Sequence, residues 1–96
     1  MAVRLIVPMQ AAVGKRDELI EVFRVRCSEV RLEPGCEEFE LYQSTERPDQ
    51  LLLVEKWTDE ATLQAHAELN RQRGNNVGSL RKGTSQAERY MMQDSN

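Results

Sequence analysis

Six short segments with regular apolar spacing follow one another along this chain and leave little freedom for its fold. Apolar and polar residues alternate at 3–9, 36–44 and 84–93, and 51–57 is a short, mostly apolar run that also reads as a strand. Apolar residues recur every three or four positions at 15–32 and from Thr58 or Asp59 to about Asn70. Alternation is typical of a strand with one buried face, and a spacing of three or four is typical of an amphipathic helix. The predicted order is strand, helix, strand, strand, helix, strand.

Turn-forming residues separate these segments. Gly14 precedes the first helix, and the dipeptide Pro34-Gly35 ends it. Proline disfavours helical backbone at the residue before it, and glycine permits a left-handed turn. The stretch RPDQ at 47–50 separates the two middle strands, because proline and aspartate favour turns. Residues 71–83 form an expected loop, with a short helical turn near 77–81.

This order of elements predicts an α+β fold. Crossovers of this kind are right-handed, so the βαββαβ order gives a ferredoxin-like, four-stranded antiparallel sheet with both helices on one face. A chain of 96 residues has room for one such domain, which we place at 1–96.

Because both helices lie on one face, the other face of the sheet is left uncovered. The segment 51–57 is apolar on both faces except at Glu55 and Lys56, which suggests that both faces are covered. A domain of this size is also marginal as a monomer. We therefore expect a homodimer, with two sheets packed face to face around a twofold axis.

Charge and composition exclude several classes of protein. The net charge is −3 and the basic residues are spread along the chain, so we expect no nucleic-acid partner. The apolar runs are too short to cross a bilayer, and the first ten residues lack the layout of a signal peptide. We expect a cytoplasmic protein without membrane contact. Two cysteines and one histidine are too few for a metal site, so no metal and no bound cofactor are expected.

One stretch concentrates unusual residues. LLLVEKWTDEATLQAH, at 51–66, contains Glu55, the only tryptophan, Trp57, and the only histidine, His66. Residues two apart in a strand share a face, so Glu55 and Trp57 point the same way. If that face is turned to the second helix, the two side chains and His66 meet in a pocket between sheet and helix. Apolar walls are expected from Val7, Met9 and Phe23.

The three side chains suit proton abstraction from a phenol or enol. A neutral imidazole accepts a proton near physiological pH, and a carboxylate can fix its tautomer. An indole offers a flat wall and one N–H donor. Each residue also has an ordinary structural interpretation: Trp57 as core, His66 as a satisfied polar residue, and Glu55 as an ion-pair partner of Lys56, Arg4 or Arg89.

Their order resembles a known family, the antibiotic biosynthesis monooxygenases. The resemblance rests on Gly14-Lys15, EPGC at 33–36, FELYQS at 39–44 and above all VEKWTDEATLQAH at 54–66. It implies a ferredoxin-like protomer, a dimeric α+β barrel and a pocket between sheet and helices. Characterised relatives oxidise polycyclic phenols or quinols with dioxygen, without a metal or flavin.

The resemblance also implies roles for individual residues. His66 would be the base or hydrogen-bond partner, Trp57 would hold the substrate ring or a dioxygen-derived oxygen, and Glu55 would orient His66. Asn70 is a further polar candidate. Many relatives carry a second His-Phe pair after the first histidine, where this chain has Asn70, Arg71 and Arg73. Haem-degrading relatives use an asparagine on the first strand, where this chain has Val7, so haem degradation is not expected.

Three hypotheses follow. We favour a cofactor-independent monooxygenase that oxidises a quinol or phenol with dioxygen. The second is an isomerase or other proton-transfer enzyme for a small anionic metabolite, held by Arg71 and Arg73, because guanidinium groups suit phosphate. The third is a non-catalytic dimeric binding module in which Glu55, Trp57 and His66 are structural.

Overall fold

The computed structural model describes residues 1–74 and 77–93. Its elements are β1 (Ala2–Gln10), α1 (Arg16–Val30), β2 (Cys36–Gln43), β3 (Gln50–Trp57), α2 (Glu60–Arg73), the short 3-10 helix η1 (Gly78–Leu80) and β4 (Glu88–Met92). The order of strands and helices expected from the sequence is confirmed, and η1 lies within the segment where a helical turn was expected.

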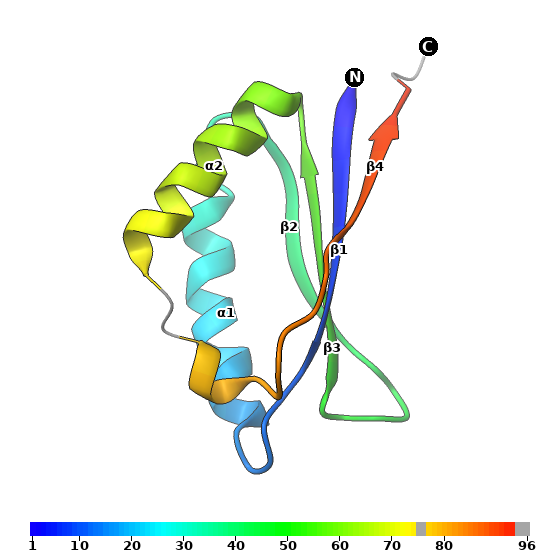
Figure 1. Cartoon of the computed structure of the whole chain (residues 1–96), viewed down its shortest axis with the longest axis vertical. Coiled ribbons are helices and arrows are strands. Elements are labelled where there is room, and N and C mark those ends of the chain that lie inside the picture. The colour runs from blue at the N-terminus through cyan, green and yellow to red at the C-terminus, as the bar shows by residue number, and fades with distance from the viewer. Residues whose placement is uncertain (75–76, 94–96) are drawn as a thin grey trace.

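The strands form one antiparallel sheet in the order β2-β3-β1-β4. Both helices lie on the same face of this sheet (Figure 1). This is the ferredoxin-like α+β arrangement that the sequence predicts. Since β1 and β3 are the central strands and pair along their whole length, their side chains on the helix side form the floor of the core.

The first helix presents one apolar stripe to the sheet. Leu19, Phe23, Cys27 and Val30 are its buried residues, which confirms the spacing of three or four expected at 15–32. The helix ends before Pro34-Gly35. Gly35 has φ +81°, a left-handed conformation that glycine adopts at little cost.

The strand β3 sets the direction in which Glu55 and Trp57 point. Its burial alternates along its length, with Leu51, Leu53, Glu55 and Trp57 buried beneath the helices. The helix-side orientation of Trp57, which the sequence alone left open, is therefore settled. The intervening residues of β3 point to the opposite face of the sheet and remain half-buried.

The second helix is longer than the sequence indicates. Asp59 caps it, since its side chain accepts a hydrogen bond from the backbone N–H of Thr62 at 2.9 Å. The helix continues to Arg73, past the expected end near Asn70. Arg71 and Arg73 are thus helical residues rather than loop residues. Part of the expected loop, at 75–76, lies outside the described residues.

The last strand is shorter than expected. We predicted strand over 84–93, but β4 covers only Glu88–Met92, and its pairing with β1 stops at Ile6. Two residues further along β1 is Pro8, which has no N–H to offer a neighbouring strand. The carbonyl of Pro8 instead accepts a hydrogen bond from the hydroxyl of Ser85. The missing donor explains why regular pairing does not extend towards residue 84.

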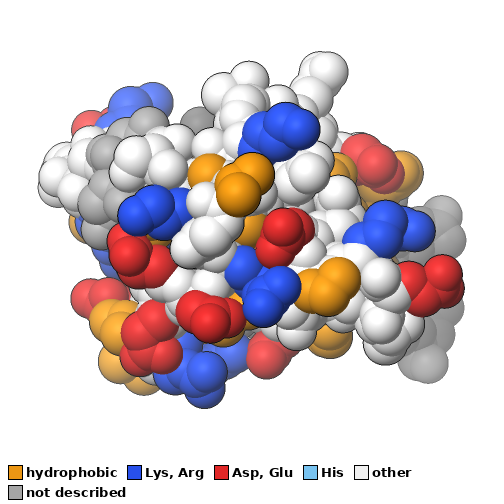
Figure 2. All heavy atoms as spheres, turned by 90° about the horizontal axis from the view of Figure 1, so that it is seen from below, with side chains coloured by type: hydrophobic (Ala, Val, Ile, Leu, Met, Phe, Trp, Pro, Cys, Tyr) orange, Lys and Arg blue, Asp and Glu red, His pale blue; other side chains and the backbone are white. Residues whose placement is uncertain are grey.

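The face of the sheet opposite the helices carries half-buried apolar side chains. Ile6, Pro8, Leu52 and Val54 occupy its two central strands. No helix of the described residues covers this face (Figure 1). Among the same residues, no helix has the length and apolar character needed to span a membrane. Figure 2 views the end of the molecule nearest the β1–α1 loop, where acidic and basic side chains are interspersed.

Candidate functional site

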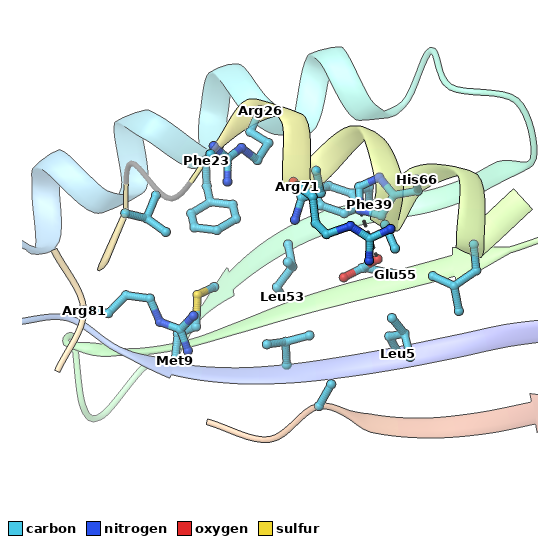
Figure 3. A pocket seen from close by; sticks show the side chains of 17 residues that line it. Leu5, Met9, Phe23, Arg26, Phe39, Leu53, Glu55, His66, Arg71 and Arg81 are labelled. Carbon is cyan, nitrogen blue, oxygen red and sulfur yellow. Dashed lines mark ion pairs between the residues drawn. The ribbon is translucent and has the colours of Figure 1, made fainter. Parts of the chain in front are cut away.

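A cavity of about 660 Å³ lies between the helices and the sheet. This volume is within the usual range for small-molecule sites. Most of its wall is apolar and comes from both helices and the three strands β1, β2 and β3; the apolar side chains are Leu5, Val7, Met9, Phe23, Phe39, Leu53 and Leu63. The polar side chains on the wall are few, and Figure 3 shows them converging on the cavity from different elements.

His66 is held on its Nδ1 side by a carboxylate far away in the sequence. The Nδ1 atom lies 2.9 Å from Oε1 of Glu33, in the turn between α1 and β2. The other oxygen of Glu33 accepts a hydrogen bond from Arg73 at 2.8 Å. A carboxylate accepts hydrogen bonds, so Nδ1 carries the ring hydrogen. In the neutral imidazole, the Nε2 atom then keeps its lone pair.

Glu55 lies on the Nε2 side of the same imidazole. Its Oε1 atom accepts a hydrogen bond from the indole N–H of Trp57 at 3.0 Å. The same oxygen is 3.9 Å from Nε2 of His66. Glu55 and His66 both line the cavity, and each side chain is 7% exposed. The imidazole lone pair and a carboxyl group therefore lie next to each other at the cavity wall.

Aromatic rings fix the plane of the imidazole. The indole of Trp57 stacks on His66, and the ring of Phe39 meets His66 edge-on with ring centroids 5.6 Å apart. Trp57 has no exposed surface at all. These contacts, with the hydrogen bond to Glu33, leave the ring of His66 little freedom to rotate.

Burial sets the protonation of Glu55. Withdrawal from water raises the pKa of the Glu55 carboxyl above its ordinary value, and the nearby charge of Glu33 acts in the same direction. The hydrogen bond from Trp57 and the proximity of His66 oppose this rise without reversing it. The protonated form of Glu55 is thus favoured more than in a solvated glutamate.

Most of the residues predicted for the site lie together on the cavity wall. These are Glu55, His66, Asn70, Arg71, Val7, Met9 and Phe23. Two predicted residues lie elsewhere. Trp57 sits behind His66, out of contact with the cavity, so it cannot be the flat wall for a substrate ring that the sequence suggested. Arg73 is turned to Glu33 and does not line the cavity.

The role expected for Glu55 also changes. We expected Glu55 to orient His66, but the short contact to the imidazole comes from Glu33. The side chains suggested as ion-pair partners of Glu55 have other partners: Arg4 pairs with Glu38, Lys56 with Glu37 and Arg89 with Glu60. In the described part of the chain, none of these three cations pairs with Glu55. Its near neighbours are Trp57 and His66.

Sequence reasoning missed three residues of the site. Glu33 was considered only as the residue before a proline, although its carboxylate anchors His66. Phe39 was considered only as part of the strand segment FELYQS, although its ring contacts His66. Arg81 was placed in a loop, yet it lines the cavity. The one available signal was EPGC at 33–36, which holds an acidic residue immediately before a fixed turn.

One protein family matches this chain. The family model described as antibiotic biosynthesis monooxygenase matches residues 2–73. No curated protein matches the chain.

Solved structures share the fold over nearly the whole chain. Rv0793 from Mycobacterium tuberculosis superposes with a TM-score of 0.83 at 22% identity, covering 99% of this chain and 98% of its own. PA3566 from Pseudomonas aeruginosa gives 0.81 at 24% identity, covering 97% and 95%. A protein from Deinococcus radiodurans gives 0.85 at 16% identity, covering 100% and 96%.

Proposed function

This chain belongs to the antibiotic biosynthesis monooxygenase family, and from that premise we propose that it oxidises a phenol or quinol with dioxygen, without a metal or flavin. One observation carries the proposal. The Nε2 lone pair of His66 lies at the wall of a large apolar cavity, while its Nδ1 atom is anchored on Glu33. A base fixed in this way is suited to deprotonate a hydroxyl group on a ring inside the cavity.

Deprotonation is the step that the protein has to provide. His66 takes the hydroxyl proton at Nε2, and Glu33 stabilises the resulting imidazolium through Nδ1. The phenolate gives one electron to dioxygen, and the two radicals combine at a ring carbon. The peroxide anion takes the proton back from His66, and the resulting hydroperoxide loses water, together with the hydrogen of the same ring carbon, to leave a quinone. One phenol and one dioxygen thus become one quinone and one water, with a single oxygen atom incorporated.

Glu55 supplies a second polar group next to the base. In its protonated form, a carboxyl group donates a hydrogen bond as well as accepting one. Since burial raises the pKa of Glu55, this donor form is favoured at the cavity wall. It would stabilise negative charge that develops on an oxygen of the substrate or of the bound hydroperoxide. Trp57 acts indirectly, by holding Glu55 and by stacking on His66.

The apolar walls define the kind of ring that fits. Phe23 of α1 and Phe39 of β2 offer aromatic surfaces, and Leu53 of β3 lies on the floor of the cavity. Such a cavity favours a flat, largely hydrophobic molecule. This supports an aromatic substrate over a small polar one.

The proposal includes a homodimer. The apolar residues on the helix-free face, among them Ile6, Leu52 and Val54, would pack against the same face of a second copy. A twofold arrangement of sheets buries this face without requiring a different partner. It would also relieve the marginal stability of a domain of this size.

A second function, proton transfer on a small anionic metabolite, is favoured by the arginines on the cavity wall. Arg26, Arg71 and Arg81 all line it. An isomerase of this kind would use His66 as base and need no dioxygen. A non-catalytic binding module would use the same cavity with no dependence of turnover on His66.

The decisive experiment measures dioxygen consumption by chelator-treated protein with a panel of naphthohydroquinones and polycyclic phenols. His66→Gln is compared with Gln64→Ala, which alters an exposed residue on the same helix. Loss of a general base should lower the rate by about 10²–10⁴-fold in His66→Gln only. Equal uptake by wild type and His66→Gln would refute the proposal. Turnover of anionic metabolites without oxygen would instead support the isomerase.

A further inference from the structure

One end of the cavity is built by residues beyond the span that the family model matches. The model covers residues 2–73, whereas Gly74, Val77, Arg81 and Ala87 also line the cavity. Figure 3 shows Arg81 beside Met9, at the end away from Glu55 and His66. This end therefore lies outside the matched span, and among these four residues Arg81 is the charged one.

The backbone that carries Arg81 is fixed on both sides. Arg81 forms an isolated β-bridge with Ala11. The carbonyl of Leu80 accepts a hydrogen bond from the N–H of Ala12 at 2.8 Å, and the N–H of Lys82 donates to Gln10 at 2.8 Å. The segment is thus tied to the end of β1 and the loop that follows, so the guanidinium starts from a rigid base rather than from a free loop.

The guanidinium of Arg81 has hydrogen-bonding capacity to spare. Its Nη2 atom donates to the hydroxyl of Ser85 at 2.9 Å. Its Nε atom is buried without a hydrogen-bond partner among residues 1–74 and 77–93. Over the same residues, no carboxylate forms an ion pair with it, whereas Arg71 is paired with Glu68. The guanidinium of Arg81 thus lines the cavity with one side-chain hydrogen bond and no counter-ion among the described residues, so it can accept an anionic partner there.

From this geometry we propose that Arg81 binds a carboxylate on the substrate, whose hydroxyl-bearing ring lies against His66 and Glu55 at the other end. The substrate class is then a polycyclic phenol or quinol that carries a carboxylate away from the reacting hydroxyl. This inference rests on the proposed function for its reaction, but the anion site itself can be tested without it. A guanidinium presents N–H donors in a fork that matches a carboxylate.

The separation of the two ends sets the length of the substrate. Glu55 is opposite Leu5 of β1 in the sheet. Arg81 lies beside Met9, which is also on β1. Four residues of strand extend about 13 Å at ~3.3 Å each. A single ring cannot reach from one end to the other, but fused rings with a pendant carboxylate can.

The charges on the wall also fix the direction in which such a molecule binds. Three arginines, Arg26, Arg71 and Arg81, and one carboxyl group, that of Glu55, line the cavity. An excess of positive charge in a cleft attracts an anion. Arg81 lies at the end of the cavity away from Glu55 and His66, so a carboxylate bound to Arg81 leaves the hydroxyl-bearing ring at the end that holds His66.

The first experiment measures binding, with probes that cannot be oxidised. By calorimetry, 2-naphthoate and its neutral counterpart 2-naphthalenemethanol are titrated into wild type, Arg81→Gln, Arg81→Lys and Lys82→Gln. Lys82 is the exposed neighbouring cation and does not line the cavity. Wild type and Lys82→Gln should bind naphthoate about 10-fold or more tightly than the alcohol, on the scale of hydrogen bonds to a charged group. Arg81→Gln should lose this preference, and Arg81→Lys should keep part of it.

The outcomes separate this inference from the monooxygenase proposal. If wild type binds the alcohol as tightly as naphthoate, the anion site is refuted, whatever the oxygen uptake. The same holds if Arg81→Gln and Arg81→Lys both retain the full preference. If the preference depends on Arg81 but no phenol supports oxygen uptake, the anion site stands and the oxidation proposal fails. If uptake does occur, Arg81→Gln should raise KM for a carboxylated naphthohydroquinone and leave KM for the uncarboxylated one unchanged.

Discussion

The imidazole of His66 lies flat against the indole of Trp57, with ring centroids 4.6 Å apart and planes inclined by 29°. The same indole donates its N–H to Glu55, the other polar group at this end of the cavity. Trp57 therefore positions both groups from behind without reaching the cavity. A residue that looked from the sequence like part of the binding surface is instead its support.

Replacing Trp57 should separate these two contributions. Trp57→Ala should lower the free energy of unfolding by about 3–5 kcal/mol as a large core truncation. Trp57→Phe keeps a ring against His66 but removes the donor to Glu55, so it should cost less stability and still slow oxidation. Urea denaturation measures the stability of both variants. It is followed by circular dichroism, because the only tryptophan is lost and its fluorescence cannot be used. Leu69→Ala, at a residue 41% exposed, is the control; equal costs at both positions would contradict the prediction.

Glu33→Gln should impair catalysis more than binding. Glu33 touches His66 but does not line the cavity. We expect kcat to fall by about 10-fold or more, the scale of a hydrogen bond to a charged group, with KM nearly unchanged. Steady-state oxygen uptake separates the two parameters, and Glu46→Gln, at an exposed loop residue, serves as control. A rise in KM with kcat preserved would show that Glu33 acts on substrate binding instead.

Glu55 should make stability depend on pH. Its folded-state pKa is raised, mainly by burial. The stabilisation from its protonated form is therefore complete below the unfolded value of about 4.3, and is lost as the pH rises through the folded pKa. Glu55→Gln removes this ionisation, so its stability relative to wild type should increase as the pH rises above about 4.3. Thermal denaturation of both proteins across this range is the measurement; a constant difference would contradict the pKa direction.

Two glycines with positive φ should respond differently to alanine. Gly14 has φ +75° and open space around it, whereas Gly35 has φ +81° and an added Cβ would lie 2.4 Å from Thr62. Gly14→Ala should cost about 1–2 kcal/mol from backbone strain alone. Gly35→Ala should cost more and also slow oxidation, because it forces apart α2 and the turn that carries Glu33. Chemical denaturation and oxygen uptake of both variants test this, and equal effects would rule out the contact with Thr62 as the cause.

Charge on the helix-free sheet face should disrupt the proposed dimer. Val54→Glu places a carboxylate among half-buried apolar residues on a central strand. We expect sedimentation velocity to show a dimer for wild type and a monomer for this variant. Val13→Glu, at a loop residue 93% exposed, should leave the dimer intact. A monomeric wild type at micromolar concentration would remove the basis for this prediction.

The sequence by itself determined the order of elements and most of the buried stripe. Leu19, Phe23 and Val30 were found from helical spacing, and the shared face of Glu55 and Trp57 from the alternation of a strand. Both are local periodicities, which a chain carries in the spacing of its own residues. The start of β4 at Glu88 was missed because it depends on Pro8, which lies on a different strand.

Only the tertiary structure decided which groups meet at the site. Glu33 lies 33 positions before His66, yet its carboxylate is the group that fixes the imidazole. Arg81 reaches the cavity because its backbone is tied to Ala11 and Ala12, far earlier in the chain. Contacts of this kind depend on how helices and strands pack, and periodicity within one element does not record them. The sequence thus determined the fold and the segment that contains Glu55, and the packing of helices and strands determined which side chains contact one another in the site.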